Sequence, residues 1–194
     1  MSNGEFKALV GEFKTQAFIL GALVASFWLI EIIDVFLYRG SLNSYGIIPR
    51  SPVGLRGIFF APFLHGNFLH LATNTGPFLI LGWLVMVQKT SHFFLVSAIT
   101  MLVSGLGVWL FGAPYSVHIG ASGVIFGYLG FLLFRGYFQR NFSSILLSLL
   151  VAFFWGSLIW GVLPSMPRIS WEGHLFGFIG GILAARILPK NKRI

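Results

Sequence analysis

Residues 118–127, HIGASGVIFG, decide how the rest of this chain is interpreted. Ser122 stands between small residues, Gly120-Ala121 and Gly123, and it opens a long apolar run. In a glycine-rich membrane protein, such a cluster usually marks a face where helices pack. The serine therefore becomes a candidate for chemistry only if polar residues of other segments reach the same depth.

The composition is typical of a protein that crosses the membrane several times. Of the 194 residues, 56% are hydrophobic and only 9% are charged. Cysteine is absent, which excludes a disulfide framework and a thiolate site. The formal net charge is +8, but the basic residues lie between apolar runs or at the ends of the chain. We attribute this charge to membrane topology and expect no nucleic-acid partner.

Six apolar segments are long enough to cross a bilayer. They cover residues 17–37, 68–87, 93–111, 122–138, 145–163 and 171–188. Ahead of them, Phe6, Leu9 and Phe13 repeat at helical spacing among charged residues, which predicts a helix on the membrane surface. We therefore predict an all-α polytopic membrane protein. A short amphipathic cytoplasmic segment (1–16) would precede a six-helix membrane domain (17–190).

Two features near the first span are less regular. The connection over residues 38–64 is too polar and too rich in proline to span, and its apolar patch at 58–60 predicts that it lies partly in the interface. Connections of this length are often functional. Glu31 and Asp34 fall near the far end of the first span, and we favour an interfacial position for both over a functional role.

The distribution of basic residues predicts the topology. Six spans place both termini on one side, and an inside N-terminus puts nine Lys and Arg residues inside and four outside. We therefore expect a multi-pass membrane protein with cytoplasmic termini, in a bacterial plasma membrane or in an internal membrane. The inside set is Lys7, Lys14, Lys89, Arg135, Arg140, Arg186, Lys190, Lys192 and Arg193, and the outside set is Arg39, Arg50, Arg56 and Arg168.

Polar residues of three spans fall at one depth. We count each separation to a residue near the inner edge of the membrane. Ser122 lies thirteen residues from Arg135, and His174 lies fourteen from Leu188. Asn74 lies fifteen residues from Lys89. At ~1.5 Å per residue these separations are about 20 to 22 Å. In a hydrocarbon core about 30 Å thick, the three side chains would meet roughly 10 Å below the outer surface. His70 lies one turn before Asn74 on the same helical face.

This convergence suggests acyl-transfer chemistry. A serine hydroxyl is a weak nucleophile until a base takes its proton, and His174 is the candidate base and then the acid for the leaving amine. Gly123 and Gly177 would let the two helices approach closely enough. We expect Glu172 to face the loop, so the site would be a dyad. The side chains of His70 and Asn74 and the Ser122 amide are candidate oxyanion donors.

A metal site is not expected. The chain has no H-E-x-x-H motif and no cysteine. His65, His70 and Asn74 would make a poor ligand set, because no carboxylate lies among them. We expect His65 and His118 to be loop residues near the mouth of the site.

Taken together, the motifs resemble those of the rhomboid family of intramembrane serine proteases. The resemblance covers residues 17–188 and is carried by His65-x4-His70-x3-Asn74, Gly120-x-Ser122-Gly123 and His174-x2-Gly177-x3-Gly181. It implies a six-helix bundle with a water-filled cavity open to the outside. It also implies hydrolysis of peptide bonds in single-span transmembrane proteins, among membrane lipid and without a cofactor.

The resemblance also implies residue roles. Ser122 would be the nucleophile and His174 the base, with His70, Asn74 and the Ser122 amide as the oxyanion hole. Gly120, Gly123, Phe126 and Gly177 would support the site. Many bacterial members carry a tyrosine four residues after the nucleophile, where this chain has Phe126. The aromatic packing on the histidine would survive, and a hydroxyl role would not.

Two other functions compete with proteolysis. A non-catalytic rhomboid-like protein could bind transmembrane helices in membrane quality control, but the presence of both Ser122 and His174 argues against it. A small transporter or channel would suit a buried polar cluster. The chain, however, lacks the two matched halves with broken helices that such proteins show.

Overall fold

The computed structural model describes residues 2–164 and 169–188. These residues form α1 (Asn3–Ile33), α2 (Gly57–Phe60), α3 (Phe68–Gln88), α4 (Thr90–Phe111), α5 (Ser122–Gln139), α6 (Phe142–Trp155) and α7 (Trp171–Ile187). A π-helical turn covers Asp34–Tyr38, and 3-10 turns cover Ser41–Tyr45, Pro52–Arg56, Ala61–Phe63 and Gly156–Val162. The described part contains no strand, only an isolated bridge between Ile47 and His118. The predicted all-α class is confirmed.

The bundle is a membrane bundle by length and composition. Among the described residues, four helical segments are long and apolar enough to cross a bilayer, namely Asn3–Tyr38, Phe68–Val87, Thr90–Phe111 and Phe142–Val162. They match four of the six predicted spans. The other two predicted spans, α5 and α7, have 18 and 17 residues and are not among these four. The total of six spans therefore stays a prediction.

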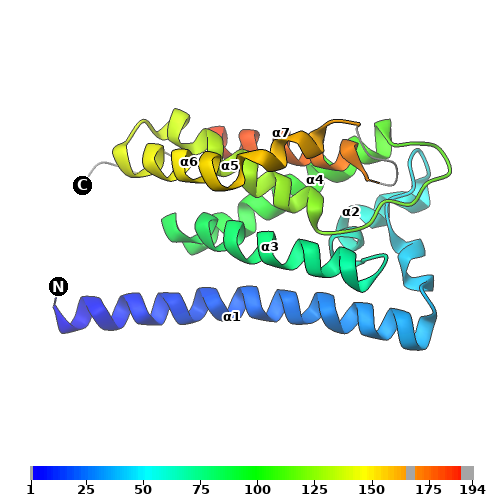
Figure 1. The fold of residues 1–194 in the computed structure, drawn as a ribbon, viewed down its shortest axis with the longest axis horizontal. Coiled ribbons are helices and arrows are strands. Elements are labelled where there is room, and N and C mark those ends of the chain that lie inside the picture. The colour runs from blue at the N-terminus through cyan, green and yellow to red at the C-terminus, as the bar shows by residue number, and fades with distance from the viewer. Residues whose placement is uncertain (1, 165–168, 189–194) are drawn as a thin grey trace.

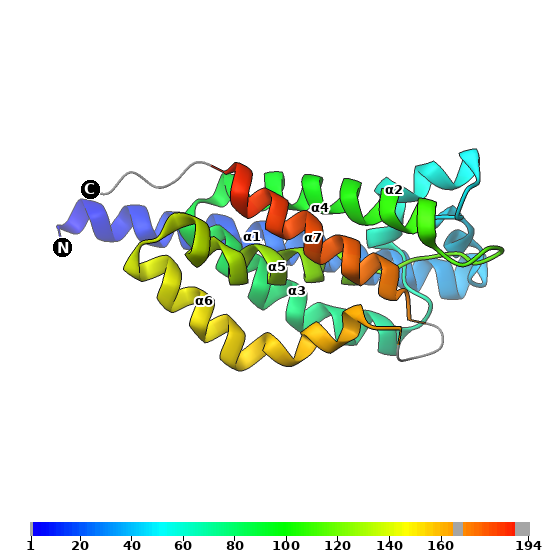
Figure 2. The ribbon, with the colours of Figure 1, turned by 90° about the horizontal axis from the view of Figure 1, so that it is seen from above.

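Helix α5 is the centre of the arrangement. It packs against α3, α4, α6 and α7, whereas α1 lies along one edge of the bundle beside α3 (Figure 1). Nearly every side chain from Val124 to Leu132 is buried. The first turns of α1 and the last turns of α7 lie toward the same end of the bundle (Figures 1 and 2). The start of α5, with Ser122, lies toward the other end.

The N-terminal segment differs from the expected surface helix. We expected a helix over residues 1–16 that is separate from the first span, but Asn3–Ile33 is one continuous helix. Ser2 and Glu5 form a capping box at its start. The only glycine between Phe6 and Leu20 is Gly11, which does not break the helix. Residues 3–16 therefore extend the helix of the first span without a break, and their place on the membrane surface stays a prediction.

Glu31 and Asp34 lie at the end of α1 and are buried within the protein, at 2% and 1% exposed. Their position at the membrane interface stays a prediction. One Asp34 carboxylate oxygen accepts a hydrogen bond from the backbone N–H of Leu42 at 2.8 Å. Asp34 therefore fixes the turn that leads from α1 into the long connection.

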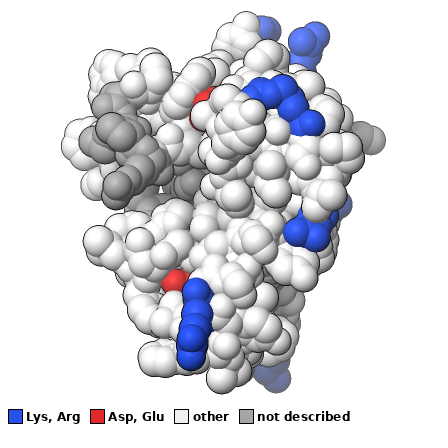
Figure 3. All heavy atoms as spheres, turned by 90° about the vertical axis from the view of Figure 1, so that its right-hand side faces the viewer, with Lys and Arg blue, Asp and Glu red and all other residues white. Residues whose placement is uncertain are grey.

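The connection between α1 and α3 is anchored on α4. The backbone N–H of Arg50 donates to the Trp109 carbonyl at 2.9 Å, and the Trp109 indole donates to the Ser51 carbonyl at 2.8 Å. Ile58 contacts Gly105 so closely that a Cβ there would be 2.8 Å from its side chain. Seen from this end of the molecule, the described surface carries basic side chains in separate patches and no continuous charged face (Figure 3).

Close packing of α5 and α7 positions the candidate site. A Cβ added at Gly177 would overlap the Gly123 carbonyl, and one at Gly181 would overlap the Gly127 carbonyl. A Cβ at Gly130 would likewise overlap the Phe178 carbonyl. The two backbones touch along more than one turn, which only glycine permits at these positions.

Candidate active site

One cavity collects the predicted polar residues. It has a volume of about 790 Å³, and its lining includes Ser122 from α5, His174 from α7, and His70 and Asn74 from α3. Ser122 is the first residue of α5, so its backbone N–H has no partner within that helix. The structure therefore brings together the four residues that the motifs predict. Phe126 lies on the wall of the same cavity.

The segment before Ser122 is shaped by Gly120. Its φ of +114° lies outside the region that other residues adopt readily, and a Cβ would be 2.8 Å from the His70 ring. Its N–H donates to the Ala61 carbonyl at 2.8 Å. Glycine at this position lets the chain pass directly against His70 before α5 begins.

His174 is held in one orientation and one tautomer. Its Nδ1 lies 2.8 Å from the carbonyl oxygen of Gly161, which can only accept. Nδ1 must therefore carry a proton, and in the neutral imidazole this leaves Nε2 as an acceptor. The Phe126 ring stacks on the imidazole with centroids 4.1 Å apart and planes 6° apart. The predicted ring packing is present without a hydroxyl.

Gly161 contacts the candidate site and was not predicted from the sequence. A Cβ there would be 2.6 Å from the Phe126 ring and 3.5 Å from His174 Nδ1. The position must therefore be small for the histidine and its stacking partner to fit beneath it. A backbone carbonyl leaves no side-chain signal, so only the glycine itself could have suggested the contact.

Asn74 is an available donor in the cavity. The side chain is 7% exposed, and its Nδ2 has no hydrogen-bond partner among the described residues. Buried amide groups are normally paired, so an orphan NH₂ beside Ser122 suggests a partner that arrives with a ligand. A Cβ at Gly120 would lie 3.7 Å from this nitrogen, which puts the amide next to the segment that leads into Ser122.

The structure does not pair Ser122 with His174 directly. Within residues 2–164 and 169–188, the Ser122 hydroxyl makes no hydrogen bond with the imidazole. Catalytic hydrogen bonds are often long without substrate and tighten when it binds. The tautomer of His174 is the one that such a bond needs.

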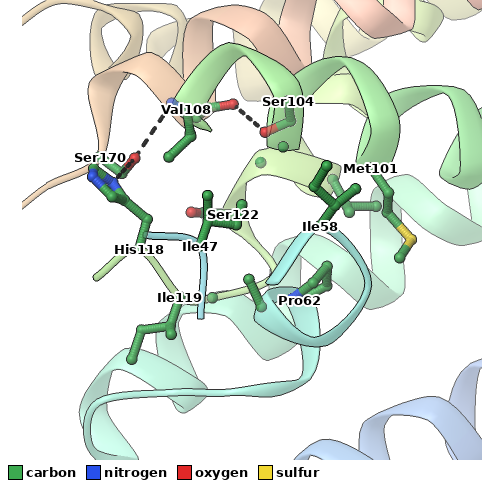
Figure 4. Close-up of a pocket in the computed structure, with 16 residues that line it drawn as sticks. Ile47, Ile58, Pro62, Met101, Ser104, Val108, His118, Ile119, Ser122 and Ser170 are labelled. Atoms are coloured by element: carbon green, nitrogen blue, oxygen red, sulfur yellow. Dashed lines mark hydrogen bonds between the residues drawn. The ribbon is translucent and has the colours of Figure 1, made fainter. Parts of the chain in front are cut away.

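Behind Ser122, a second set of polar contacts holds the start of α7 (Figure 4). The Ser104 hydroxyl donates to the Gly173 carbonyl at 2.8 Å, and the Ser170 hydroxyl accepts from the Gly173 N–H at 3.4 Å. His118 Nδ1 lies 2.6 Å from the Ser170 hydroxyl. A serine just before Trp171 is a recognisable helix N-cap, so Ser170 could have been found from sequence.

Two side chains, those of His65 and Glu172, depart from their expected places, whereas His118 lies in a loop and lines the cavity as expected. His65 is not at the mouth but 1% exposed, with its ring 5.1 Å from that of His70. Burial, reinforced by repulsion from His70, lowers the pKa of His65 to about 4 and keeps it neutral. Glu172 is 6% exposed and lines the cavity instead of facing the loop. Burial also lowers the pKa of His118, and the Glu172 carboxylate opposes that shift.

The described residues contain no group of three or more His, Asp or Glu side chains that could hold a metal ion. What the cavity offers is a hydroxyl, a neutral imidazole with a free acceptor, and amide or imidazole donors. These are the functional groups that nucleophilic attack on a carbonyl carbon requires.

Fold and cavity together define a class, an all-α membrane protein whose central helices carry a serine and a histidine into one polar cavity. Residues 53–191 match the family model of the Rhomboid domain. The chain belongs to the rhomboid family.

Three relatives are similar to this chain, and two of them are named as rhomboid proteases. The chain is 42% identical over 178 residues to the uncharacterized protein Rv1337 of Mycobacterium tuberculosis, which covers 88% of this chain and 74% of the relative. It is 28% identical over 198 residues to the putative rhomboid protease YdcA of Bacillus subtilis, and the match covers 96% of this chain and 94% of the relative. It is 32% identical over 134 residues to the rhomboid protease GluP of the same organism, and the match covers 66% of this chain and 25% of the relative.

Proposed function

We propose that this protein is an intramembrane serine endopeptidase that uses Ser122 and His174 as a dyad. The observation that carries the proposal is the fixed tautomer of His174, whose Nδ1 is bound to the Gly161 carbonyl at 2.8 Å. An imidazole held in this way presents an unprotonated Nε2 to the cavity that Ser122 also lines. The family membership and the relative named a rhomboid protease add support.

The proposed reaction has two halves. The Ser122 hydroxyl oxygen attacks the scissile carbonyl while its proton passes to His174 Nε2. The imidazolium then gives that proton to the leaving amine, and a water molecule repeats the sequence on the acyl-enzyme. The Ser122 N–H at the start of α5 and the donors on His70 and Asn74 stabilise the oxyanion.

The proposal extends to substrate and location. Substrates are single-span transmembrane proteins, presented in the lipid of a bacterial plasma membrane to an enzyme with cytoplasmic termini. A competing proposal is a non-catalytic protein that binds transmembrane helices in quality control. Incubating the purified protein with a labelled single-span substrate separates the two. Fragments support the protease, whereas stable binding without fragments supports the alternative.

We expect single His70→Ala and Asn74→Ala variants to slow turnover more than they weaken substrate binding. Oxyanion donors act mainly on the transition state, and losing one typically reduces kcat by about 10²–10³-fold. The test compares kcat and KM in proteoliposomes for both single variants and the double variant. A double variant that cleaves at the wild-type rate would remove these residues from the mechanism.

We expect the cut to fall near the outer end of the substrate helix. The helix counts place Ser122 about 10 Å below the outer surface. A transmembrane helix hides its peptide bonds and must unwind before attack, so substrates should carry Gly, Pro or polar residues at that end. Small residues should be preferred at the scissile bond, because the site lies between glycine-rich helices. Mass spectrometry of both fragments tests this, and a cut at the cytoplasmic end would overturn the assigned topology.

A further inference from the structure

A second cavity lies at the opposite end of α5 from Ser122. It has a volume of about 230 Å³ and is lined by Arg135, Tyr137, Phe138, Arg140, Ala185, Arg186 and Leu188. Helix α5 has 18 residues, so the two ends are about 25 Å apart. The lining carries three guanidinium groups, and none of the described lining residues is acidic. This cavity is therefore separate from the candidate active site and strongly positive.

Arg135 forms a rigid wall of this cavity. It is 1% exposed, and its Nη1 donates to the carbonyl oxygens of Ala185 and Leu188, both at 3.0 Å. The first carbonyl belongs to the last turn of α7 and the second to the residue that follows the helix, where carbonyl groups have no partners within the helix. The guanidinium thus ties the end of α7 to α5 and fixes a positive charge beside the exposed side chains of Arg140 and Arg186.

An apolar groove adjoins the basic cavity. It has a volume of about 330 Å³, runs between α5 and α6, and is lined by Gly136, Tyr137, Arg140, Ile145, Ser148 and Leu149. Tyr137 and Arg140 belong to both hollows, so the two are neighbours. Ile145 and Leu149 are 44% and 62% exposed, on a helix that is long and apolar enough to face lipid. The paired hollows are complementary to an amphiphile with an anionic head.

We propose that these hollows bind one anionic phospholipid. Its phosphate lies between Arg140 and Arg186 beside Arg135, and an acyl chain lies in the groove against Ile145 and Leu149. A guanidinium group can donate two parallel hydrogen bonds to phosphate oxygens and also carries the opposite charge. Basic pockets between membrane helices are known to bind anionic lipid headgroups. Inorganic phosphate shares the headgroup chemistry but makes no use of the groove, so the structure favours the lipid.

Arg140 offers a variant that separates binding from folding. It ends α5 in the left-handed conformation, with φ 55°, where glycine is favoured. Arg140→Gly should therefore not lower thermal stability in neutral detergent, yet it removes a phosphate ligand. Arg39 is a matched control, because it ends the π-helical turn with φ 53° in the same conformation. Arg39→Gly removes the same charge away from the proposed site.

The test measures thermal unfolding of the full chain in neutral micelles titrated with phosphatidylglycerol. We expect Tm to rise for the wild type and for Arg39→Gly. Arg140→Gly and Arg186→Gln should each need about ten times more phosphatidylglycerol than the wild type to reach the half-maximal increase in Tm. Phosphatidylcholine should give no comparable rise. Because Tm is the readout, the result is independent of whether the protein cleaves anything.

Three outcomes would overturn the proposal. Equal responses of wild type and Arg140→Gly would show that the cavity does not bind the headgroup. An equal loss in Arg39→Gly would indicate a general effect of net charge. An equal rise of Tm with the same concentration of inorganic phosphate would show that the ligand is a free anion and that the groove plays no part.

Discussion

Replacing Ser122 by alanine is expected to reduce cleavage of a single-span substrate to background, a loss of about 10⁴-fold or more, in a protein that still folds and inserts. The substitution removes the proposed nucleophile but keeps the Cβ, and the α5–α7 contact is made by glycines rather than by this side chain. The rate would be measured with a labelled substrate in proteoliposomes. A fluorophosphonate probe should label the wild type and not the variant.

The control for this experiment is a serine that lies outside the cavity. Ser26 in α1 donates to the Leu23 carbonyl of its own helix at 2.7 Å, so Ser26→Ala makes the same chemical change away from the site. Ser26→Ala should cleave at the wild-type rate and keep its probe labelling. Turnover that persists in purified Ser122→Ala would exclude the serine mechanism.

Replacing Gly177 by alanine is expected to damage stability and activity together. The added Cβ would overlap the Gly123 carbonyl, one residue from Ser122, so α5 and α7 must separate. Overpacking of this kind typically costs about 1–3 kcal/mol, and valine at the same position should cost more. The separation would also move His174 away from Ser122. Thermal unfolding in detergent and the cleavage rate would both be measured.

Gly21 provides the matched control for the glycine substitution. It lies in α1, and a Cβ there would meet nothing within 4 Å. Gly21→Ala should therefore leave the rate unchanged and raise stability by up to ~1 kcal/mol, because alanine is the better helix former. If Gly177→Ala behaves like Gly21→Ala, close packing at Gly177 does not hold the site together.

Much of the site could be predicted from the sequence because its residues carry side-chain signals. Helical counting put Ser122, His174 and Asn74 at one depth, and the structure finds all three on one cavity. The glycine spacing predicted the close approach of α5 and α7, which the Gly177–Gly123 contact confirms. These signals survive because depth and face follow from fixed helical geometry.

Other features could not be read from the sequence. The Gly161 carbonyl that binds His174 is a backbone group, and it belongs to a 3-10 turn, Gly156–Val162, that no residue pattern distinguished from the rest of the predicted span. The burial of His65 and Glu31 depends on how the long connection folds onto the bundle. The continuity of α1 past residue 16 reflects helix propagation, which does not stop where the amphipathic pattern changes.

The bond between His174 and Gly161 has a consequence for how such a site is surveyed. Where a carboxylate orients the histidine, a single substitution deletes the orienting group and exposes its role. Here the acceptor belongs to the main chain, and every amino acid at position 161 supplies the same carbonyl. A mutational scan would show only that large side chains at position 161 are not tolerated, because they meet the Phe126 ring. The scan would therefore assign the position a role in packing alone. In the proposed catalytic group, the partner of the histidine is therefore a main-chain atom, which side-chain substitutions cannot remove and which only the structure reveals.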